Sequence, residues 1–576
     1  MFRSVFRYWR YALPAALLMV LEVLADLWQP RLMAEIVDQG ILGLEGSGGA
    51  SADIIRSTGL VMLAVTFGGC LCGVLSGACA SIFSQCAAHG IRRECFSTVM
   101  KFSPREIQEF TAGSLLTRCT QDAAQIQMTL AQAVRGGVRC LMFLGAGSAA
   151  LLAMSPDFAL VMAIAVPLVI LETVFVLRRA SPLFTRTQES LDRLNTVIRE
   201  SVEGIRIIKA CAGEEREGRK FTGASRDLSD LQFRTAVLLC TLHPVMNIVL
   251  NLAAAGIIQI GAFQVEAGAL APGAVIAGVT YASQILMSLL MAAMLFQSAS
   301  RGAASAARIS QVLRCQATSR GGNVTSGSRK GEVEFRNVTF SYPGRSAPAL
   351  EKASFTIGRG QFLAILGSTG SGKSTIARLL LGFHEPDEGQ ILVEGTDTRE
   401  FDRTALRTCI AAVLQDCRIF RGTVAANIAA GGNEEDLEGI RRAAELAQAD
   451  SFISALPEGY RTFLPGGGAG LSGGQRQRIA IARALYRHQD ILLLDDSFSA
   501  LDSETEARVR EGIRKSCRDM TRIIITQRAA TVRDADLILV LDRGRICAAG
   551  THRELAASSP ECRAILSSQE EDSHES

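Results

Sequence analysis

Six long apolar segments set the strongest limit on what this chain can fold into. A helix needs roughly 20 mostly apolar residues to cross the hydrocarbon core of a bilayer. Stretches that reach this length are residues 12–36, 57–86, 127–154, 158–178, 236–262 and 272–300. Hydrophobic residues make up 48% of the 576 residues. The first half of the chain is therefore predicted to be a membrane domain with six transmembrane helices.

The distribution of Lys and Arg predicts the orientation of these helices. The short connections 43–55, 155–157 and 263–271 contain no Lys or Arg, whereas 87–126 and 178–234 are rich in both. Because basic residues concentrate in cytoplasmic loops, both termini are expected in the cytoplasm of a bacterial plasma-membrane protein. The two basic stretches look helical, so the membrane helices are expected to extend into the cytosol.

The N-terminus resembles a signal peptide only at first sight. Arg3, Arg7 and Arg10 precede an apolar run that is too long for a signal peptide and lacks a small-residue cleavage site. Residues 1–11 are interpreted as an amphipathic lead-in on the membrane surface.

Composition excludes some classes of protein. A net charge of +3 gives no basis for nucleic-acid binding, and no nucleic-acid partner is expected. The fifteen cysteines lack the spacing of a disulfide framework. Several lie in apolar runs, and we interpret them as small buried side chains of a reduced protein.

Three carboxylates lie inside the predicted spans. Glu22 and Asp26 are one helical turn apart on one face, and Glu172 lies in the fourth span. Intramembrane carboxylates are costly and usually face a cavity or a partner. They form either a substrate or proton pathway or a structural hydrogen-bonding pair, and we favour the structural interpretation.

The pattern changes after residue 315. Residues 316–331 form a polar Gly/Ser-rich linker after the membrane domain of residues 1–315. Residues 332–568 then alternate short apolar runs with helical stretches, which predicts an α/β domain with a largely parallel sheet. Residues 569–576 form an acidic tail. The strands are expected at 362–366, 410–414, 491–494, 522–526 and 537–541.

A phosphate-binding loop follows the first of these strands. Residues 367–374, Gly-Ser-Thr-Gly-Ser-Gly-Lys-Ser, fit the pattern G-x-x-x-x-G-K-[ST] between a strand and a helix. The glycines let backbone N–H groups surround phosphate oxygens, and Lys373 is expected to reach the β- and γ-phosphates of ATP. Ser374 is a predicted Mg²⁺ ligand. The predicted nucleotide contacts are Gly367, Ser368, Thr369, Gly370, Ser371, Gly372, Lys373, Ser374 and Thr375.

Two further motifs belong with this loop. The apolar strand Ile491–Leu494 ends in Asp495, a second expected Mg²⁺ ligand. The sequence Leu471-Ser472-Gly473-Gly474-Gln475 opens a predicted helix, whose N-terminus is an anion site. In this order the motifs resemble the ATP-binding cassette (ABC) transporters, and nearly the whole chain resembles the exporter-type half-transporters with six helices and a C-terminal cassette.

The resemblance implies further roles, one position at a time. Tyr342 matches the aromatic residue that stacks on adenine, and Gln415 matches the glutamine that contacts Mg²⁺. Ser472, Gly473, Gly474 and Gln475 match the signature that closes on ATP held by a second cassette. Residues 499–502 match the loop that crosses the interface between cassettes. Residues 113–122 and 200–209 resemble the cytoplasmic connections that dock on the cassettes.

Departures from the family pattern are equally informative. Asp496 stands where active cassettes have the glutamate that orients the attacking water, and Gln527 stands where they have histidine. Aspartate is about 1.5 Å shorter in reach, and displacement of about 1 Å costs roughly 10²-fold in rate. Glutamine cannot carry a proton near pH 7. In residues 466–470, Gly-Gly-Gly-Ala-Gly, the glutamate that exporters often have before the signature is missing.

These features resemble the catalytically degenerate subunit of heterodimeric bacterial exporters. The chain is expected to bind ATP in its own site and to hydrolyse it only weakly. Its signature is expected to complete the ATP site of a second half-transporter. Together the two would move a small, amphipathic substrate across the lipid bilayer. The alternatives are a slow homodimeric exporter, an importer with an exporter fold, and a nucleotide-gated regulatory membrane protein.

Overall fold

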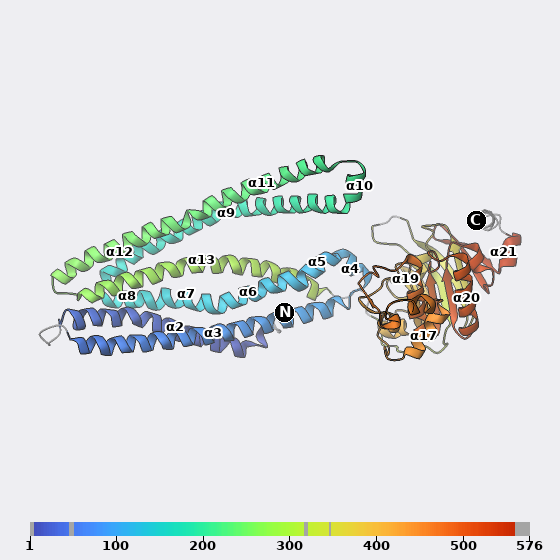
Figure 1. The fold of residues 1–576 in the computed structure, drawn as a ribbon, viewed down its shortest axis with the longest axis horizontal. Coiled ribbons are helices and arrows are strands. Elements are labelled where there is room, and N and C mark those ends of the chain that lie inside the picture. The colour runs from blue at the N-terminus through green and yellow to red at the C-terminus, as the bar shows by residue number, and fades with distance from the viewer. Residues whose placement is uncertain (1–4, 45–50, 316–320, 345–346, 559–576) are drawn as a thin grey trace. The chain divides into compact units, whose positions relative to one another are not determined.

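The computed structural model describes residues 5–44, 51–315, 321–344 and 347–558, and these divide into two compact units (Figure 1). The first is a membrane unit of residues 1–100 and 111–316. The second is a C-terminal unit of residues 317–576 together with residues 101–110. The predicted linker lies partly, and the acidic tail wholly, outside the described residues.

The regular secondary structure of the membrane unit is helical throughout its described residues. In the described part of the chain, six helical segments are long and apolar enough to cross a membrane. Each contains one of the six predicted spans, which confirms the predicted membrane fold. They are Trp9–Ile41, Ala52–Val99, Ala112–Met154, Pro156–Glu203, Glu214–Glu266 and Pro272–Arg314.

These segments divide into shorter elements, several of them π-helical turns. The elements are α2 (Trp9–Glu35), η1 (Ile36–Ile41), α3 (Ala52–Val99), α5 (Ala112–Thr117), η2 (Arg118–Asp122), α6 (Ala123–Gln132), η3 (Ala133–Gly137), α7 (Val138–Met142), η4 (Phe143–Gly147), α8 (Ser148–Met154), α9 (Pro156–Glu203), α10 (Ile205–Ala210), α11 (Glu214–Cys240), α12 (Leu242–Glu266) and α13 (Pro272–Arg314).

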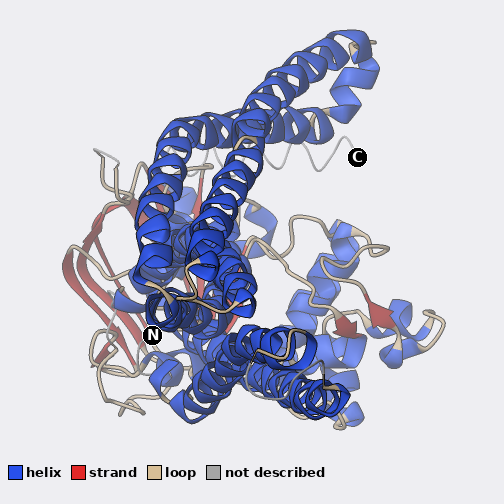
Figure 2. Ribbon diagram, turned by 90° about the vertical axis from the view of Figure 1, so that its left-hand side faces the viewer, coloured by secondary structure: helices blue, strands red, loops and turns tan. Residues whose placement is uncertain are grey.

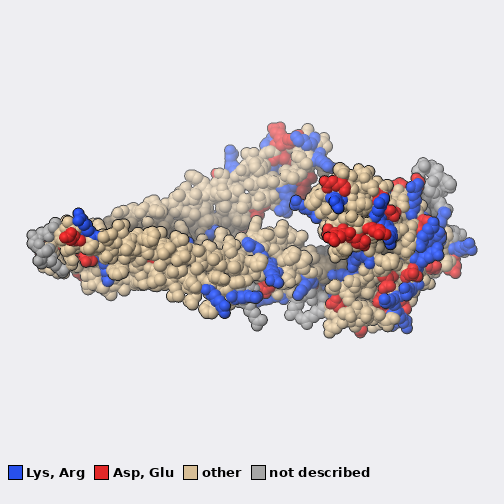
Figure 3. All heavy atoms as spheres, turned by 60° about the horizontal axis from the view of Figure 1, so that its bottom comes forward, with Lys and Arg blue, Asp and Glu red and all other residues tan. Residues whose placement is uncertain are grey.

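The membrane unit packs around a core of large apolar side chains. Phe158, Tyr281 and Ile285 are fully buried in it. The Tyr281 hydroxyl donates to the Leu27 carbonyl at 2.7 Å, which joins α13 to α2. On the face that Figure 3 shows, most of the surface of these helices is tan and carries neither acidic nor basic side chains. An apolar exterior of this kind suits lipid rather than water.

Helices α9, α10 and α11 form an arm on the membrane unit (Figures 1 and 2). α11 packs along α9, and Gly204 separates the end of α9 from the start of α10. Apolar side chains are exposed near the α10 end, where Val202 is 65% and Ile207 70% exposed. We use the term helical arm for residues 180–235.

The C-terminal unit contains two main sheets, shown red in Figure 2. The six-stranded sheet has the order β12-β11-β3-β10-β9-β6, and the four-stranded sheet has the order β2-β1-β4-β5. All pairs in the larger sheet are parallel except β11 with β12. The strands are β1 (Val333–Phe340), β2 (Leu350–Ile357), β3 (Phe362–Gly367), β4 (Glu388–Val393), β5 (Thr396–Asp397), β6 (Ile410–Val413), β7 (Gly422–Thr423), β8 (Phe463–Leu464), β9 (Ile491–Asp495), β10 (Thr521–Ile525), β11 (Leu537–Asp542) and β12 (Arg545–Gly550).

The five predicted strands correspond to β3, β6, β9, β10 and β11, which confirms the α/β cassette. The antiparallel four-stranded sheet is an addition that the sequence pattern did not predict. The helical elements of the unit are α4 (Pro104–Phe110), α14 (Lys373–Leu380), α15 (Arg403–Thr408), α16 (Val424–Ala429), α17 (Leu437–Leu446), α18 (Asp450–Ser454), η5 (Gly459–Arg461), α19 (Gly473–Arg487), α20 (Ser503–Ser516), η6 (Ala529–Val532) and α21 (His552–Ser558).

Two hydrophobic cores lie on opposite faces of the six-stranded sheet. Side chains alternate between faces along a strand, so Leu363 and Ile365 of β3 join the core shared with the antiparallel sheet. Ala364 and Leu366 join the core beneath the helices. Because both faces are covered, the strand reads as a continuous apolar run.

Candidate ATP site

The carboxyl ends of the central strands bring the predicted site residues to one edge of the sheet. β9 pairs with β10 so that Asp495 lies beside Ile525, and β10 pairs with β3 so that Ile525 lies beside Ile365. Residues that follow these parallel strands therefore emerge together. They include the phosphate-binding loop after β3, Gln415 after β6, Asp496 after β9 and Gln527 after β10.

The phosphate-binding loop has the backbone conformation that its glycines permit. Gly370 has φ +84° and Gly372 φ +103°, in the region that favours glycine. A Cβ at Gly372 would lie 2.4 Å from the Ala349 carbonyl oxygen. α14 begins directly after this residue, so its free N–H groups point into the loop.

Lys373 lies at the centre of the loop. Its Nζ donates to the carbonyls of Gly367 and Ser368, each at 2.7 Å. Burial lowers the pKa of Lys373, while the carboxylates of Asp496 and Asp495 raise it. The ammonium therefore lies within the field of both acidic residues, where it can face phosphate oxygens.

Two of the three residues predicted to contact Mg²⁺ also contact each other. Ser374 Oγ donates to Asp495 Oδ1 at 3.0 Å. Asp495 is buried, and burial raises its pKa. A hydroxyl and a carboxylate are the oxygen donors that Mg²⁺ prefers beside phosphates, so this donor set fits the ion. Gln415 is exposed beyond the end of β6.

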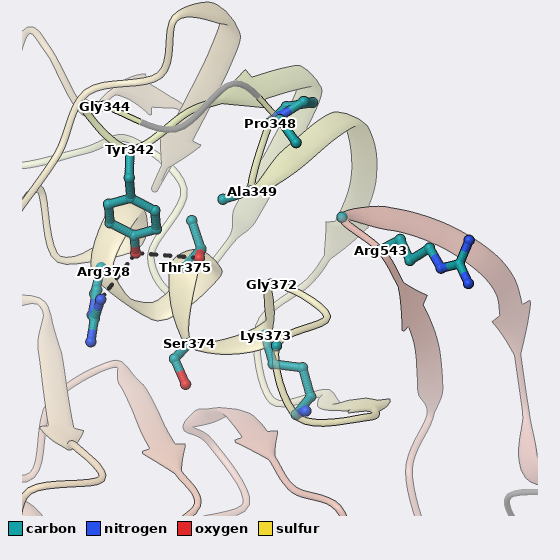
Figure 4. A pocket seen from close by; sticks show the side chains of 13 residues that line it. Tyr342, Gly344, Pro348, Ala349, Gly372, Lys373, Ser374, Thr375, Arg378 and Arg543 are labelled. Atoms are coloured by element: carbon teal, nitrogen blue, oxygen red, sulfur yellow. Dashed lines mark hydrogen bonds between the residues drawn. The ribbon is translucent and has the colours of Figure 1, made fainter.

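A cavity of about 810 Å³ opens beside the loop (Figure 4). Tyr342 forms one wall, and its hydroxyl lies 3.3 Å from Thr375 Oγ1 and accepts a hydrogen bond from Arg378 at 3.1 Å. These contacts hold the Tyr342 hydroxyl beside the start of α14. Arg378, Arg543 and Gly544 also line the cavity but were not predicted, because they belong to no motif.

Asp496 and Gln527 lie at the same edge as the loop. Asp496 has φ +49°, and its N–H donates to the Ile525 carbonyl at 2.9 Å. Burial raises the pKa of Asp496, whereas the charges of Lys373 and Arg528 lower it. Gln527 is exposed. The neighbouring Arg528 binds Glu506 Oε2 at 2.5 Å, which ties this edge to α20.

The signature lies at the N-terminus of α19. Ser472 and Gln475 form a capping box, in which Gln475 N–H donates to Ser472 Oγ at 3.2 Å and Ser472 N–H donates to Gln475 Oε1 at 2.9 Å. Ser472 accepts in this contact, so its hydroxyl proton is available to an anion. Gly473 and Gly474 pack against Ala500, and a Cβ at Gly474 would lie 2.8 Å from the Ala500 carbonyl.

Among the residues that the structure describes, no residue of the signature lines the nucleotide cavity. The signature is instead joined to the loop 499–502, since Gln477 Nε2 donates to Ser499 Oγ and Gln477 Oε1 accepts from Ala500 N–H, each at 3.0 Å. One chain thus presents a nucleotide cavity and a separate helix N-terminus.

The two predicted docking segments lie in different parts of the membrane unit. Residues 113–122 belong to α5 and η2 of the membrane unit, whereas the preceding residues 101–110 group with the C-terminal unit. Residues 200–209 comprise the last residues of α9, Gly204 and most of α10, at the end of the helical arm.

Comparisons with known proteins agree with this geometry. Residues 14–289 match the family model "ABC transporter transmembrane region", and residues 350–499 match the model "ABC transporter". An uncharacterized ABC transporter ATP-binding protein of Bacillus subtilis, YfiB, is 35% identical over 96% of both chains. An ATP-dependent lipid A-core flippase of Vibrio vulnificus is 30% identical over 94% of this chain and 92% of its own.

A solved structure gives the same result. A bacterial Atm1-family ABC exporter with ATP bound superimposes with a TM-score of 0.83, at 28% identity, over 97% of this chain and 99% of that one. The chain therefore belongs to the ABC transporters: it is an exporter half-transporter with a multi-pass membrane domain and an ATP-binding domain that acts as a transport-coupled ATPase.

Proposed function

We propose that this chain is the nucleotide-holding subunit of a heterodimeric exporter. The observation that carries the proposal is the pair Asp496 and Gln527 at the catalytic edge of the sheet, beside an intact phosphate-binding loop. Hydrolysis requires a group within hydrogen-bond reach of the water that attacks the γ-phosphate. The short Asp496 side chain and the neutral Gln527 weaken both parts of that task.

The signature supports the second half of the proposal. Ser472 caps α19 with its hydroxyl proton still available, and the adjacent helix N-terminus favours anions. This surface suits the γ-phosphate of ATP held by a second half-transporter. The partner's phosphate-binding loop and this chain's Ser472 would then form the more active of two composite sites.

Mg²⁺ is expected to accompany ATP, held by Ser374, Asp495 and Gln415 and neutralising the phosphate charge. The absence of Lys and Arg from the loops 43–55, 155–157 and 263–271 supports cytoplasmic termini. We assign the complex to the bacterial plasma membrane. The resemblance to lipid A-core flippases supports an amphipathic substrate, and export is the proposed direction.

The purified chain in lipid nanodiscs tests the subunit assignment. Steady-state ATP turnover is expected to be slow while ATP still binds tightly. The double substitution Asp496→Glu with Gln527→His is expected to raise turnover by about tenfold or more, because it restores the reach and the proton-carrying group. Binding of a fluorescent ATP analogue serves as a measure of folding.

The matched control is the same double variant carrying Lys373→Ala, in which the gain should vanish. Brisk turnover of the unmodified chain alone, lost on Lys373→Ala, would reject the degenerate site and favour a homodimeric exporter. Failure of ATP to drive uphill transport by the chain with its partner would instead favour a nucleotide-gated regulatory protein.

A further inference from the structure

A cavity within the membrane unit has two arginines in its wall. Its volume is about 420 Å³, and it lies where α2, α3, α6, η3, α7 and α13 meet. Arg135, Arg139 and Gln132 form its polar side, while Met291, Met294 and Leu295 of α13 form much of its apolar side. The lining includes no Asp or Glu among the residues that the structure describes. The charged side chains that line the cavity are therefore both arginines.

Arg139 is fixed in position by carboxylates that do not line the cavity. Its Nη1 lies 3.3 Å from Glu22 Oε1 and its Nη2 lies 3.1 Å from Asp26 Oδ2. These contacts agree with the structural interpretation of Glu22 and Asp26. They hold the guanidinium at the cavity wall and offset the cost of a charge within a membrane span.

Arg135 is different, because no ion pair or hydrogen bond to it occurs among the described residues. It lies one helical turn before Arg139 in the π-helical turn η3, an arrangement that recurs at functional sites. Gly77 of α3 faces it, and a Cβ there would lie 3.4 Å from Arg135 Nη1. An intramembrane guanidinium without a protein partner is costly unless an anion or water satisfies it.

We propose that this cavity binds an amphipathic anion, with Arg135 as the principal contact for its phosphate or carboxylate group. The Arg139 guanidinium, whose charge Glu22 and Asp26 offset, adds a fixed polar group to the wall, and the methionines of α13 receive the apolar part, since their flexible side chains adapt to irregular shapes. The proposal rests on the proposed export of an amphipathic substrate and adds the sign of its charge.

Equilibrium binding to the full chain in phosphatidylcholine nanodiscs, without ATP, tests the charge. The probes are radiolabelled oleoyl lysophosphatidate and oleoyl lysophosphatidylcholine, which share a tail and differ in net charge. The unmodified chain is expected to prefer the anion. Arg135→Gln should weaken lysophosphatidate binding about tenfold or more, as loss of a charge-assisted contact does, and leave the zwitterion unaffected.

Two further variants separate charge from shape. Arg301→Gln removes a charge from α13 outside the cavity lining and should not change either affinity. Gly136→Leu should weaken binding of both probes, because Gly136 lines the cavity and a Cβ there meets no atom within 4 Å. Thermal unfolding of each variant verifies folding.

Equal affinity for the two lipids, or an Arg135→Gln variant that binds lysophosphatidate normally, would overturn the proposal. Displacement of lysophosphatidate by equimolar inorganic phosphate would also overturn it, since the site would then recognise a free anion. Because no partner subunit or ATP turnover enters these measurements, their failure is distinguishable from failure of the heterodimer proposal.

Discussion

Gly372 illustrates how one residue sets the shape of the nucleotide site. Its φ of +103° disfavours any side chain, and a Cβ there would lie only 2.4 Å from the Ala349 carbonyl oxygen. Gly372→Ala is expected to cost about 1–2 kcal/mol from backbone strain alone, with the steric contact adding to it. ATP affinity, measured with a fluorescent analogue, should fall at least tenfold.

Gly431→Ala is the matched control for that substitution. Gly431 has φ +90°, but a Cβ there meets no atom within 4 Å, and the residue lies outside the nucleotide cavity. The control variant should lose stability and keep its ATP affinity. If both variants bind ATP normally, the close approach to Ala349 does not determine the loop conformation.

His384 is expected to make the folded cassette less stable at acidic pH. Burial, followed by the charges of Arg378 and Arg105, lowers its pKa below the usual value of about 6.5. The unfolded chain therefore binds a proton more readily, and stability falls as pH decreases through the unfolded pKa towards the folded one. His384→Phe retains a ring beside Phe340 and Tyr342, whose centroids lie 5.2 and 5.4 Å away.

In that variant the difference in unfolding temperature between pH 7.5 and 5.5 should shrink. Scanning calorimetry at both pH values measures it. An unchanged difference would assign the acid sensitivity to other groups.

At the scale of elements, α19 combines a structural cap with a proposed contact to the partner's ATP. Ser472→Ala should cost about 1 kcal/mol of stability through loss of the N-cap and should also lower ATP turnover by the heterodimer. Thr423→Ala removes a similar cap, in which Thr423 Oγ1 accepts from Ala426 N–H at 3.0 Å on α16. A comparable loss of turnover in both variants would show that Ser472 acts only as a helix cap and would reject the contact with the partner's ATP.

The elements differ in how far the sequence specifies them. The phosphate-binding loop and β9 follow from local motifs, because glycines and a buried apolar run dictate their own conformation. The sequence pattern did not predict β1, because a register shift between Arg336 and Thr339 breaks the alternation of its buried side chains. The contact of Arg139 with Glu22 joins residues 117 positions apart, which no local pattern encodes.

At the scale of the whole molecule, topology is the property most open to a direct test. A fluorescent protein fused to the C-terminus should fluoresce in a bacterial host, and alkaline phosphatase fused after Ser155 should be active, because the first works in the cytoplasm and the second outside it. Fusion of the phosphatase after Arg193, within the helical arm that the proposal places in the cytoplasm, is the control and should be inactive. The reverse pattern would invert the proposed orientation.

The helical arm also has a consequence for the amount of protein in a cell. Side chains such as Val202 and Ile207 are left exposed by their own chain, and exposed apolar surface of this kind attracts chaperones and proteases until another surface covers it. A copy made without a partner would then be cleared. In the proposed heterodimer the abundance of each half would follow that of the scarcer one, so that matched synthesis of two polypeptides becomes a condition for accumulating either.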